Sequence, residues 1–243
     1  MRLFGLIGYP LTHSFSQQYF TQKFEREHIG NCSYINLPLS TIEKFTTVQR
    51  QYPNLVGCNV TIPYKQSILD YIDEQFPIVQ QIGACNCIHF KNGKSIAHNT
   101  DVIGFKKSFL EKRETHHTTA LILGTGGASK AVQYVLDTLG ISYTLVSRTK
   151  KDNVITYEEI TPALLQSYTI IIQTTPLGTY PNVNDAPEMP YHALTPKHYC
   201  FDLIYNPAET LFLQKAKLQG AIIQNGYYML CIQAEESWKI WNS

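Results

Sequence analysis

The stretch LILGTGGAS, at residues 121–129, decides the fold class. An apolar run leads into Gly124, Gly126 and Gly127, and the small residue Ser129 stands at the third position of the motif. In a dinucleotide-binding turn the first glycine permits the tight bend, the second lets backbone amides approach the pyrophosphate, and the following helix supplies partial positive charge. A strand is expected before this turn and a helix after it, as such a motif requires. The stretch therefore predicts a nucleotide-binding α/β domain, with a ligand-free glycine-rich turn as the alternative.

The basic stretch SRTKK, at residues 147–151, follows the next expected strand and predicts the cofactor. An NAD enzyme usually places Asp or Glu there, to accept hydrogen bonds from the two ribose hydroxyls. This stretch has no acid, while Arg148 can bind a 2′-phosphate bidentately and Thr149 offers a hydroxyl. We therefore predict NADP rather than NAD, with Lys150 and Lys151 either adding charge or lying solvated in the loop.

Short apolar runs with strand character alternate with helical patterns along the whole chain, as α/β proteins require. Beyond residue 101 the expected strands cover residues 119–123, 142–146, 169–174, 199–204 and 221–224. Before it we expect strands at 3–8, 33–37 and 56–62, a hairpin around Asn92-Gly93, and helices that begin near Phe15 and cover 41–51, 64–72 and 101–112. The terminal helix carries Tyr227, Tyr228, Trp238 and Trp241, which are expected to pack rather than to bind a cofactor. The pattern predicts two α/β domains with a boundary near residue 101, the second Rossmann-like with a parallel sheet, and a cleft between them.

The bulk composition argues against several other classes of protein. The 243 residues carry a net charge of +1 with scattered Lys and Arg, whereas a nucleic-acid binder shows a basic patch or stripe. No apolar run approaches the ~18 residues that span a bilayer, and the start of the chain lacks a signal-peptide pattern. The six cysteines show neither a disulfide-scaffold pattern nor zinc spacing, and His116 and His117 lie in a polar connection. We expect a cytoplasmic monomer or homodimer with reduced thiols, no metal site, and no membrane or nucleic-acid partner.

Nine short motifs along almost the whole chain occur together in one enzyme family. Before residue 102 these motifs are GYPLTHSFS at 8–16, NVTIPYK at 59–65, GACN at 83–86 and NTD at 99–101. Beyond it they are GTGGAS at 124–129, SRT at 147–149, TTPLG at 174–178, FDLIYNP at 201–207 and GYYMLCIQ at 226–233. Each match alone is weak evidence, whereas chance hardly produces all nine in the same order. Together they resemble the shikimate dehydrogenase family.

The resemblance implies an enzyme, an NADP-dependent oxidoreductase acting on a CH–OH group. Its reaction would be the reversible reduction of 3-dehydroshikimate to shikimate, a step of chorismate and aromatic amino acid biosynthesis. The resemblance also implies a substrate-binding and catalytic domain of residues 1–101 and 226–243, and an NADP-binding domain of residues 102–225. The partner would be a small molecule, shikimate or 3-dehydroshikimate.

The resemblance further implies roles for individual residues. Lys65 and Asp101 match the catalytic pair. The substrate-binding residues would be Ser14 and Ser16 at the carboxylate and, around the ring hydroxyls, Asn59, Thr61, Lys65, Asn86, Asp101, Tyr205 and Gln233. The cofactor-binding residues would be Gly124, Gly126, Gly127 and Ala128 at the pyrophosphate, Ser147, Arg148 and Thr149 at the adenosine ribose, Leu203, Gly226 and Met229 at the nicotinamide, and in addition Thr174.

The chemistry of hydride transfer suits the two residues of the catalytic pair. A hydride that arrives at a ketone carbon leaves charge on the oxygen, and a positioned ammonium group can stabilise that charge and donate a proton. Lys65 provides such a group, and Asp101 could orient it and hydrogen-bond a substrate hydroxyl. The alternatives are a solvated helix lysine for Lys65 and a helix N-cap for Asp101, which could also serve both roles.

Ser14 and Ser16 have two possible roles at the start of the expected helix. Their hydroxyls could simply cap the helix, which the residues alone favour. Two hydroxyls before a helix N-terminus also suit a carboxylate, because the backbone amides and the helix dipole add to them. With the family resemblance, carboxylate binding is the leading interpretation.

The sequence departs from the family pattern at several positions. Asn225 stands before Gly226 where the family usually has Asp, and Cys87 replaces the usual Thr. Gln173 replaces a common Asn, and Pro77 stands where a carboxylate is often found. The segment after residue 149 is short and lacks a clear helical pattern, which predicts a trimmed adenine side of the pocket. Two alternatives stay open: a quinate/shikimate dehydrogenase of relaxed substrate or cofactor choice, and a non-catalytic NADP-binding sensor module.

Overall fold

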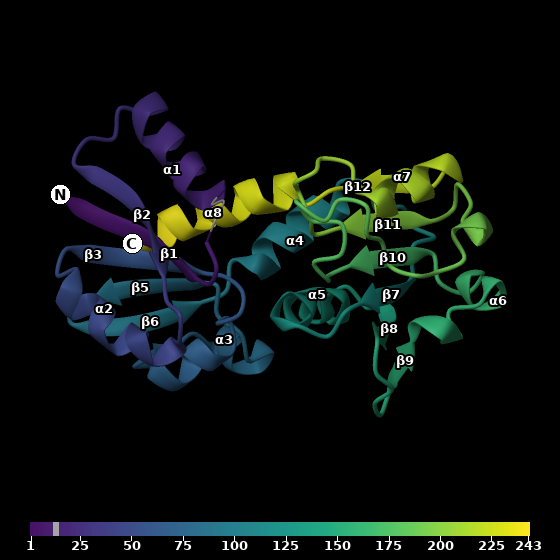
Figure 1. Ribbon diagram of the computed structural model, residues 1–243, viewed down its shortest axis with the longest axis horizontal. Helices are drawn as coiled ribbons and strands as arrows, with labels where there is room; N and C mark the ends of the chain where they lie inside the picture. The colour runs from purple at the N-terminus through teal and green to yellow at the C-terminus, as the bar shows by residue number, and fades with distance from the viewer. Residues whose placement is uncertain (12–14) are drawn as a thin grey trace. The chain divides into compact units, whose positions relative to one another are not determined.

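The chain folds as two compact units (Figure 1), and this computed structural model describes residues 1–11 and 15–243. The first unit comprises Met1–Ile103 with Gln233–Ser243, and the second comprises Gly104–Ile232. The chain enters the second unit within helix α4 (Asp101–Leu110) and returns to the first within helix α8 (Tyr227–Trp241). The predicted α/β class with a parallel sheet is confirmed. The predicted domain limits, which concern ligand binding, stay a prediction.

The first unit is built on a six-stranded sheet with the order β2-β1-β3-β5-β6-β4. Its strands are β1 (Arg2–Gly8), β2 (Cys32–Pro38), β3 (Leu55–Val60), β4 (Glu74–Gln75), β5 (Cys87–Lys91) and β6 (Lys94–His98). Strands β1, β2 and β3 run parallel, whereas β5 and β6 form an antiparallel hairpin. Asn92 and Gly93 at its turn have φ angles of 53° and 74°, as a two-residue turn of this kind requires. The predicted hairpin is confirmed.

Strand β1 is buried on both faces, which explains its almost continuous apolar sequence. Leu3 and Ile7 belong to the core that also contains residues of α2 (Phe45–Gln51). Phe4 and Leu6 belong to a second cluster with residues of α1 (Phe15–Arg26) and α8. The alternation along one strand therefore supplies two cores and holds helices against both faces of the sheet.

The helix predicted over residues 64–72 is wrong in type and length. The structure has turns followed by a short 3₁₀ helix, η2 (Ser67–Tyr71). The Lys65 carbonyl oxygen, which would accept a bond from Leu69 in an α-helix, accepts one from the Cys85 N–H at 2.7 Å. The Leu69 N–H bonds instead to the Gln66 carbonyl. A long-range backbone contact has overridden the local periodicity and fixed the position of Lys65.

The C-terminal turn of α8 docks on the sheet through Trp241. The indole N–H of Trp241 donates to the Ile88 carbonyl oxygen at 2.9 Å, and its ring stacks on Phe4 at 5.0 Å between centroids. A Cβ atom on Gly57 would lie 2.1 Å from the indole nitrogen, so only glycine leaves room for this contact. The return of the chain to the first unit therefore depends on a small residue in β3.

The aromatic residues of α8 divide according to their place along the helix. Trp238 packs against Phe4 and Trp241 is buried, so the expectation of packing is confirmed for the two tryptophans. Tyr227 and Tyr228 are 53% and 43% exposed, so that expectation is wrong for the two tyrosines. Periodicity identified the helix but not which of its turns would be covered.

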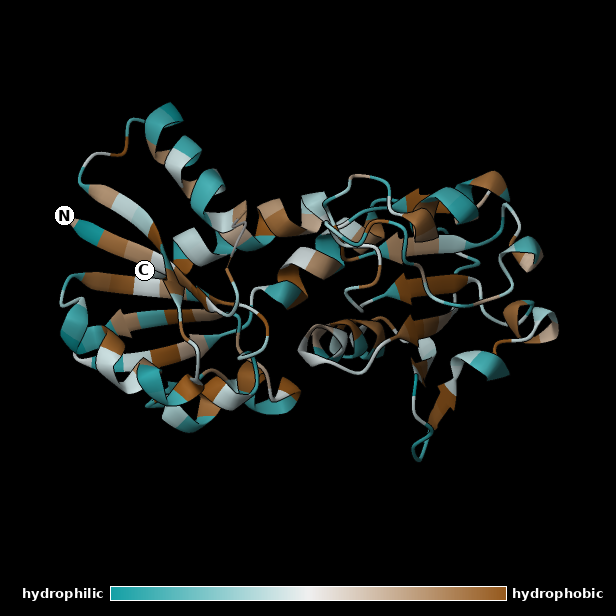
Figure 2. Ribbon diagram, in the orientation of Figure 1, coloured by the Kyte–Doolittle hydropathy of each residue, from teal (hydrophilic) through white to brown (hydrophobic). Residues whose placement is uncertain are grey.

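The second unit contains a parallel sheet with the order β12-β11-β10-β7-β8-β9. Its strands are β7 (Thr119–Leu123), β8 (Ser142–Ser147), β9 (Val154–Thr156), β10 (Ile170–Gln173), β11 (Tyr199–Asp202) and β12 (Ile222–Gln224), and its α-helices include α5 (Gly127–Thr138), α6 (Pro162–Leu165) and α7 (Leu211–Leu218). The central strands β7 and β10 are strongly apolar (Figure 2) and largely buried. The strand order reverses between β7 and β10, and such switch points are where open parallel sheets bind ligands.

We expect Gly57→Ala to lower the free energy of unfolding by about 1–3 kcal/mol, because the added methyl group overlaps the Trp241 indole. Urea denaturation measures the change. The matched control is Gly30→Ala, where an added Cβ meets no atom within 4 Å. Equal stability of the two variants would contradict the account of how α8 docks.

Candidate active site

Lys65 and Asp101 form an ion pair within the first unit. The Lys65 Nζ lies 2.7 Å from the Asp101 Oδ2, and the side chains are 16% and 2% exposed. Lys65 stands in the turns after β3, and Asp101 is the first residue of α4. The Val102 N–H in the first turn of α4 bonds to the Asn99 side chain at 3.3 Å. The sequence positions are 36 residues apart, and the fold joins them in a contact fit for proton donation and orientation.

The neighbouring cysteine is unsuited to nucleophilic chemistry. Cys85 is buried, and burial raises the pKa of its thiol to about 12. Its Sγ donates to the Cys87 carbonyl oxygen at 3.3 Å. Because a thiolate rather than a thiol is the reactive form, the chemistry of this site rests on the ammonium and carboxylate groups.

Asn59, near the C-terminal end of β3, lies beside Asn86, which directly precedes β5. The Asn59 Nδ2 is 3.3 Å from the Asn86 carbonyl oxygen. The buried Asn86 side chain is fixed by Thr100, whose N–H donates to Oδ1 at 2.6 Å and whose hydroxyl accepts from Nδ2 at 3.0 Å. Thr100 directly precedes Asp101, so the segment that carries the Asp101 carboxylate also holds the Asn86 side-chain amide in place.

The remaining residues predicted for the substrate occupy several elements. Ser14 lies outside the described residues. Ser16 is in the first turn of α1 and hydrogen-bonds to the Tyr34 phenol, whose pKa is raised well above its ordinary value by burial. Thr61 directly follows β3 and Gln233 is on α8, in the first unit, whereas Tyr205 belongs to the second unit.

The glycine turn has the backbone geometry that the sequence predicted. Gly124, directly after β7, has a φ of 112°, and a Cβ there would lie 2.7 Å from the Thr174 hydroxyl oxygen. Gly126 is the N-cap of α5, and a Cβ on it would meet no atom within 4 Å. Gly127 and Ala128 begin α5, so unpaired helix amides gather at the switch point of the sheet. These features fit a pyrophosphate, which needs close backbone approach.

The end of β8 carries the residues predicted for the adenosine ribose. Ser147 ends the strand, and Arg148 and Thr149 follow it on the surface. The Lys150 Nζ lies 2.6 Å from the Glu159 Oε1, an ion pair that the sequence analysis did not foresee. The Thr156 and Glu159 side chains form a capping box, and the T-x-x-E spacing was a signal that could have found it. Lys150 is therefore paired with Glu159. Arg148 is the cationic residue that directly follows β8.

Two of the residues predicted at the nicotinamide, Leu203 and Gly226, meet directly after β11. A Cβ on Gly226 would lie 2.1 Å from the Leu203 carbonyl oxygen, so the two backbones touch. Met229 is buried on α8. Sequence reasoning missed Asp202, which is fully buried and accepts bonds from the Thr210 hydroxyl at 2.5 Å and the Ile204 N–H at 3.0 Å. Burial raises the pKa of Asp202 to about 7, against the effect of these two hydrogen bonds.

Two departures from the family pattern have local structural roles. The Gln173 Oε1 accepts bonds from the N–H and the hydroxyl of Thr175, which fixes the backbone beside Thr174. The Asn225 side chain bonds to the Ala208 carbonyl oxygen and accepts from the Tyr227 N–H at the start of α8. Both side chains therefore hold turns that carry predicted cofactor contacts.

Comparison with known proteins reveals the family. Residues 6–88 match the family model of the shikimate dehydrogenase substrate binding domain. The NADP(+)-dependent shikimate dehydrogenase of Carboxydothermus hydrogenoformans is 36% identical over 99% of this chain and 91% of that protein. The chain belongs to the shikimate dehydrogenase family.

Solved structures of this family agree with the fold. Shikimate dehydrogenase 1 from Peptoclostridium difficile is 36% identical, with a TM-score of 0.87 over 100% of this chain and 92% of that one. The Thermus thermophilus shikimate 5-dehydrogenase, solved in complex with NADP(H) and shikimate, is 25% identical, with a TM-score of 0.86 over 99% and 93%. The predicted family is confirmed.

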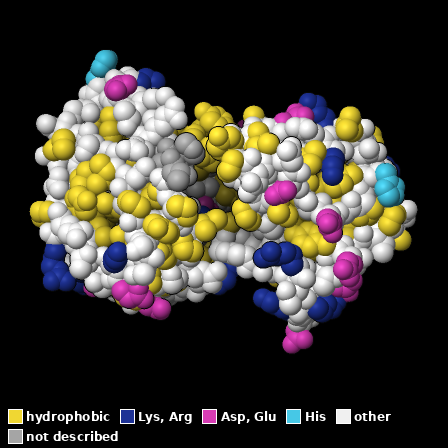
Figure 3. All heavy atoms as spheres, in the orientation of Figure 1, with side chains coloured by type: hydrophobic (Ala, Val, Ile, Leu, Met, Phe, Trp, Pro, Cys, Tyr) yellow, Lys and Arg dark blue, Asp and Glu magenta, His cyan; other side chains and the backbone are white. Residues whose placement is uncertain are grey.

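Residues 1–11 and 15–243 contain neither a metal-binding cluster nor a membrane-spanning helix. No group of three or more His, Cys, Asp or Glu in these ranges could hold a metal ion. No described helix has the length and hydropathy needed to cross a bilayer. On the face shown in Figure 3, basic and acidic side chains are interspersed.

We expect Asp202→Asn to change how stability depends on pH. Because the folded pKa is about 7 and the ordinary value is 3.8, the unfolded chain releases the proton first as pH rises. Relative to the variant, the unmutated protein should lose about 4 kcal/mol of stability between pH 3 and 8, with a constant difference above pH 8. Urea denaturation across this range measures the difference. The exposed Asp70→Asn is the control, and parallel curves for Asp202→Asn and the unmutated protein would contradict the expectation.

Proposed function

We propose that this protein is an NADP-dependent shikimate dehydrogenase, which reversibly reduces 3-dehydroshikimate to shikimate. The observation that carries the proposal is the ion pair of Lys65 and Asp101, in a chain that belongs to this family over almost its whole length. The glycine turn after β7 and the acid-free end of β8 support NADP as the cofactor. The predicted activity and cofactor agree with the curated relatives, which are NADP(+)-dependent shikimate dehydrogenases.

The first unit would perform the proton chemistry of the reaction. NADPH, when bound, supplies a hydride to the ketone carbon. The Lys65 ammonium group would stabilise the charge that develops on the ketone oxygen and donate its proton to it. Asp101 would hold the ammonium group in place through their 2.7 Å contact and accept a hydrogen bond from a ring hydroxyl. In the oxidation direction the neutral amine of Lys65 would take the proton back.

The other predicted residues would bind the two ligands. Ser14 and Ser16 would bind the substrate carboxylate, and the ring hydroxyls would meet Asn59, Thr61, Asn86, Tyr205 and Gln233. The cofactor would be held by Gly124, Gly126, Gly127 and Ala128 at its phosphates, Ser147, Arg148 and Thr149 at its ribose, and Leu203, Gly226 and Met229 at its nicotinamide, with Thr174 as a further contact. On this proposal residues 1–101 and 226–243 form the substrate-binding and catalytic domain, and residues 102–225 form the NADP-binding domain. Tyr205 is the exception on the substrate side, and Gly226 and Met229 are the exceptions on the cofactor side.

The free thiols support a reducing compartment. All six cysteines are free, and Cys58, Cys85, Cys87 and Cys200 are buried. Because disulfides are rare in the cytosol, we place the enzyme in the cytoplasm. We further propose that it is a monomer or a homodimer.

A panel of two substrates and two cofactors tests the function against its alternatives. We expect shikimate with NADP to give the highest kcat/KM, measured by the absorbance of the reduced nicotinamide. Preferred turnover of quinate would make the protein a quinate/shikimate dehydrogenase. Binding of NADP without turnover of either substrate would make it a sensor module.

We expect Lys65→Ala to lower the turnover of shikimate by ~100-fold or more, the range typical of a lost general acid–base group, with a much smaller change in KM. Steady-state kinetics measure both constants. Lys44→Ala, which removes an exposed lysine of the same unit, is the control. A Lys65→Ala enzyme with near-normal turnover would remove Lys65 from the mechanism.

We expect the unmutated enzyme to use NADP at least ~10-fold more efficiently than NAD, because Arg148 can bind the 2′-phosphate and no acid repels it. Arg148→Ala should abolish the preference, and added salt should weaken it, since the contact is exposed. Ratios of kcat/KM for the two cofactors provide the measurement, with the exposed Lys217→Ala as the control. Equal efficiency with both cofactors before mutation would refute the interpretation of residues 147–151.

A further inference from the structure

A chain of hydrogen bonds runs through the first unit from β2 to α8. The Tyr34 hydroxyl donates to the Asn59 Oδ1 at 2.9 Å, and the Asn59 Nδ2 donates to the Ser237 Oγ at 2.9 Å. The Ser237 hydroxyl donates in turn to the Gln233 carbonyl oxygen at 2.9 Å. Tyr34 and Ser237 are buried and were not among the predicted site residues. They connect two residues that were.

Two backbone carbonyls fix the direction of this chain. The Gln233 carbonyl oxygen can only accept a hydrogen bond, so the Ser237 hydroxyl donates its one hydrogen to that oxygen. The Ser237 oxygen therefore accepts from the Asn59 amide. The Asn86 carbonyl oxygen also can only accept, and it lies 3.3 Å from the same end of the Asn59 amide. The Asn59 nitrogen therefore faces Ser237 and Asn86, and its oxygen faces Tyr34.

This direction determines what Asn59 can offer to a ligand. Both amide hydrogens have acceptors in Ser237 and Asn86, whereas Tyr34 uses one of two lone pairs on the oxygen. Asn59 can therefore accept a further hydrogen bond but has no hydrogen left to donate. A substrate hydroxyl suits such a group, and an ether or carbonyl oxygen does not.

Asn86 has the opposite polarity. Its oxygen accepts from the Thr100 N–H, and one hydrogen of its Nδ2 goes to the Thr100 hydroxyl. Among the contacts of the described residues, this leaves the second Nδ2 hydrogen to donate to a ligand. The two neighbouring amides thus present one acceptor and one donor, the pattern that a pair of ring hydroxyls can satisfy.

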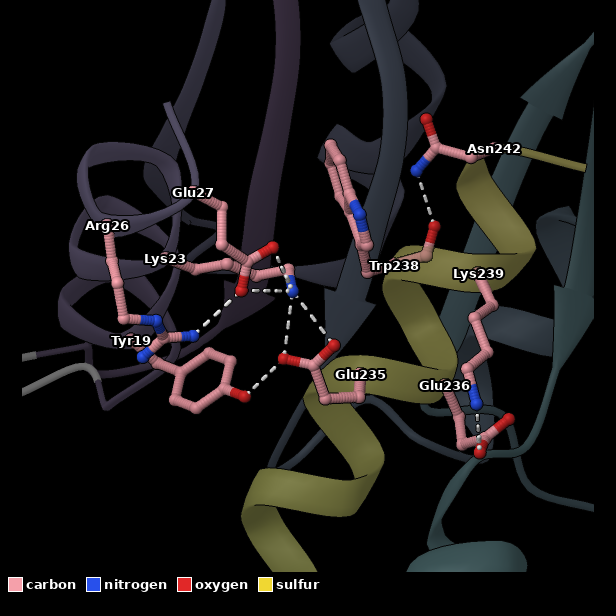
Figure 4. A network of polar contacts seen from close by, with 9 residues as sticks. All are labelled: Tyr19, Lys23, Arg26, Glu27, Glu235, Glu236, Trp238, Lys239 and Asn242. Carbon is pink, nitrogen blue, oxygen red and sulfur yellow. Dashed lines mark hydrogen bonds and ion pairs between the residues drawn. The ribbon is translucent and has the colours of Figure 1, made fainter. Parts of the chain in front are cut away.

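Helix α8 is itself held in place beside α1. Glu235 accepts hydrogen bonds from the Tyr19 hydroxyl and from the Lys23 Nζ, which also pairs with Glu27 (Figure 4). Burial of Lys23 opposes its charge, but its bonds to Glu27 and Glu235 outweigh this effect and raise its pKa. This network fixes the helix two residues before Ser237, so the Ser237 hydroxyl is presented from a rigid position.

We propose that Ser237 is a positioning residue for substrate binding. Its buried hydroxyl holds the Asn59 amide in the orientation that presents an acceptor to a substrate hydroxyl, and joins it to the backbone of Gln233. The Thr100 hydroxyl, 3.4 Å from the Ser237 Oγ, extends the same support toward Asn86. This inference rests on the proposed function, in which Asn59 contacts shikimate.

The test is Ser237→Ala in the full-length protein, with steady-state kinetics on shikimate and NADP. Loss of the acceptor frees the Asn59 amide to turn, so we expect the KM for shikimate to rise about 10-fold. Turnover should change by less than about 3-fold and the KM for NADP should stay constant, since the hydroxyl does not act on the reacting atoms. Ser237→Thr, which keeps the hydroxyl, should restore the KM.

Two further variants separate positioning from stability. Tyr34→Phe removes the bond at the other end of the Asn59 amide, together with the bond between Tyr34 and Ser16, and should raise the same KM. Ser95→Ala removes a buried hydroxyl that donates to Asp73 at 2.7 Å in the same unit, and should lower the melting temperature without changing this KM.

The outcomes distinguish this inference from the proposed function. An unchanged KM for shikimate in Ser237→Ala, or an equal rise in Ser95→Ala, would overturn the positioning role while leaving the enzyme's activity established. An unmutated protein that does not oxidise shikimate would overturn the proposed function and this inference together.

Discussion

The ion pair between the partly buried Lys65 and the buried Asp101 is the contact on which the proposed chemistry depends. A carboxylate that is almost wholly removed from water is costly unless a charge partner and hydrogen bonds compensate for it. The fold supplies the partner by diverting the backbone at Lys65 away from a helix and onto Cys85. The same contact that spoils a regular helix therefore places an ammonium group against the first residue of α4.

Each unit contributes a different physical device. In the first unit, side chains dominate. Near the ion pair lie amides and hydroxyls that use most of their hydrogen-bonding capacity on one another. The remaining acceptor of Asn59 and the remaining donor of Asn86 therefore define what a ligand must offer. In the second unit, the backbone dominates: a left-handed glycine and an open helix N-terminus lie at the switch point of a parallel sheet. The first device suits a polyhydroxylated ring, and the second suits a pyrophosphate.

The sequence predicted the parts of this protein that depend on local chemistry. The glycine turn and the hairpin are encoded by adjacent residues whose backbone requirements are known. Lys65 and Asp101 could be paired only through the family resemblance, because no local pattern relates positions so far apart. The bond between Asn59 and Ser237 spans 178 positions, and a single serine in a helix gives no local signal of such a contact. Asp202 escaped notice for a similar reason, since its burial is a property of the folded sheet.

The central claim, that Lys65 and Asp101 act as one unit, is tested most directly by a double-mutant cycle in turnover. The enzymes to compare are the unmutated protein, Lys65→Ala, Asp101→Asn and the double variant, all measured with saturating shikimate and NADP. If the pair is a unit, removing the second member adds little, and the double variant should turn over about as fast as the slower single variant. If the two losses multiply instead, the residues act independently and the account of the pair is wrong.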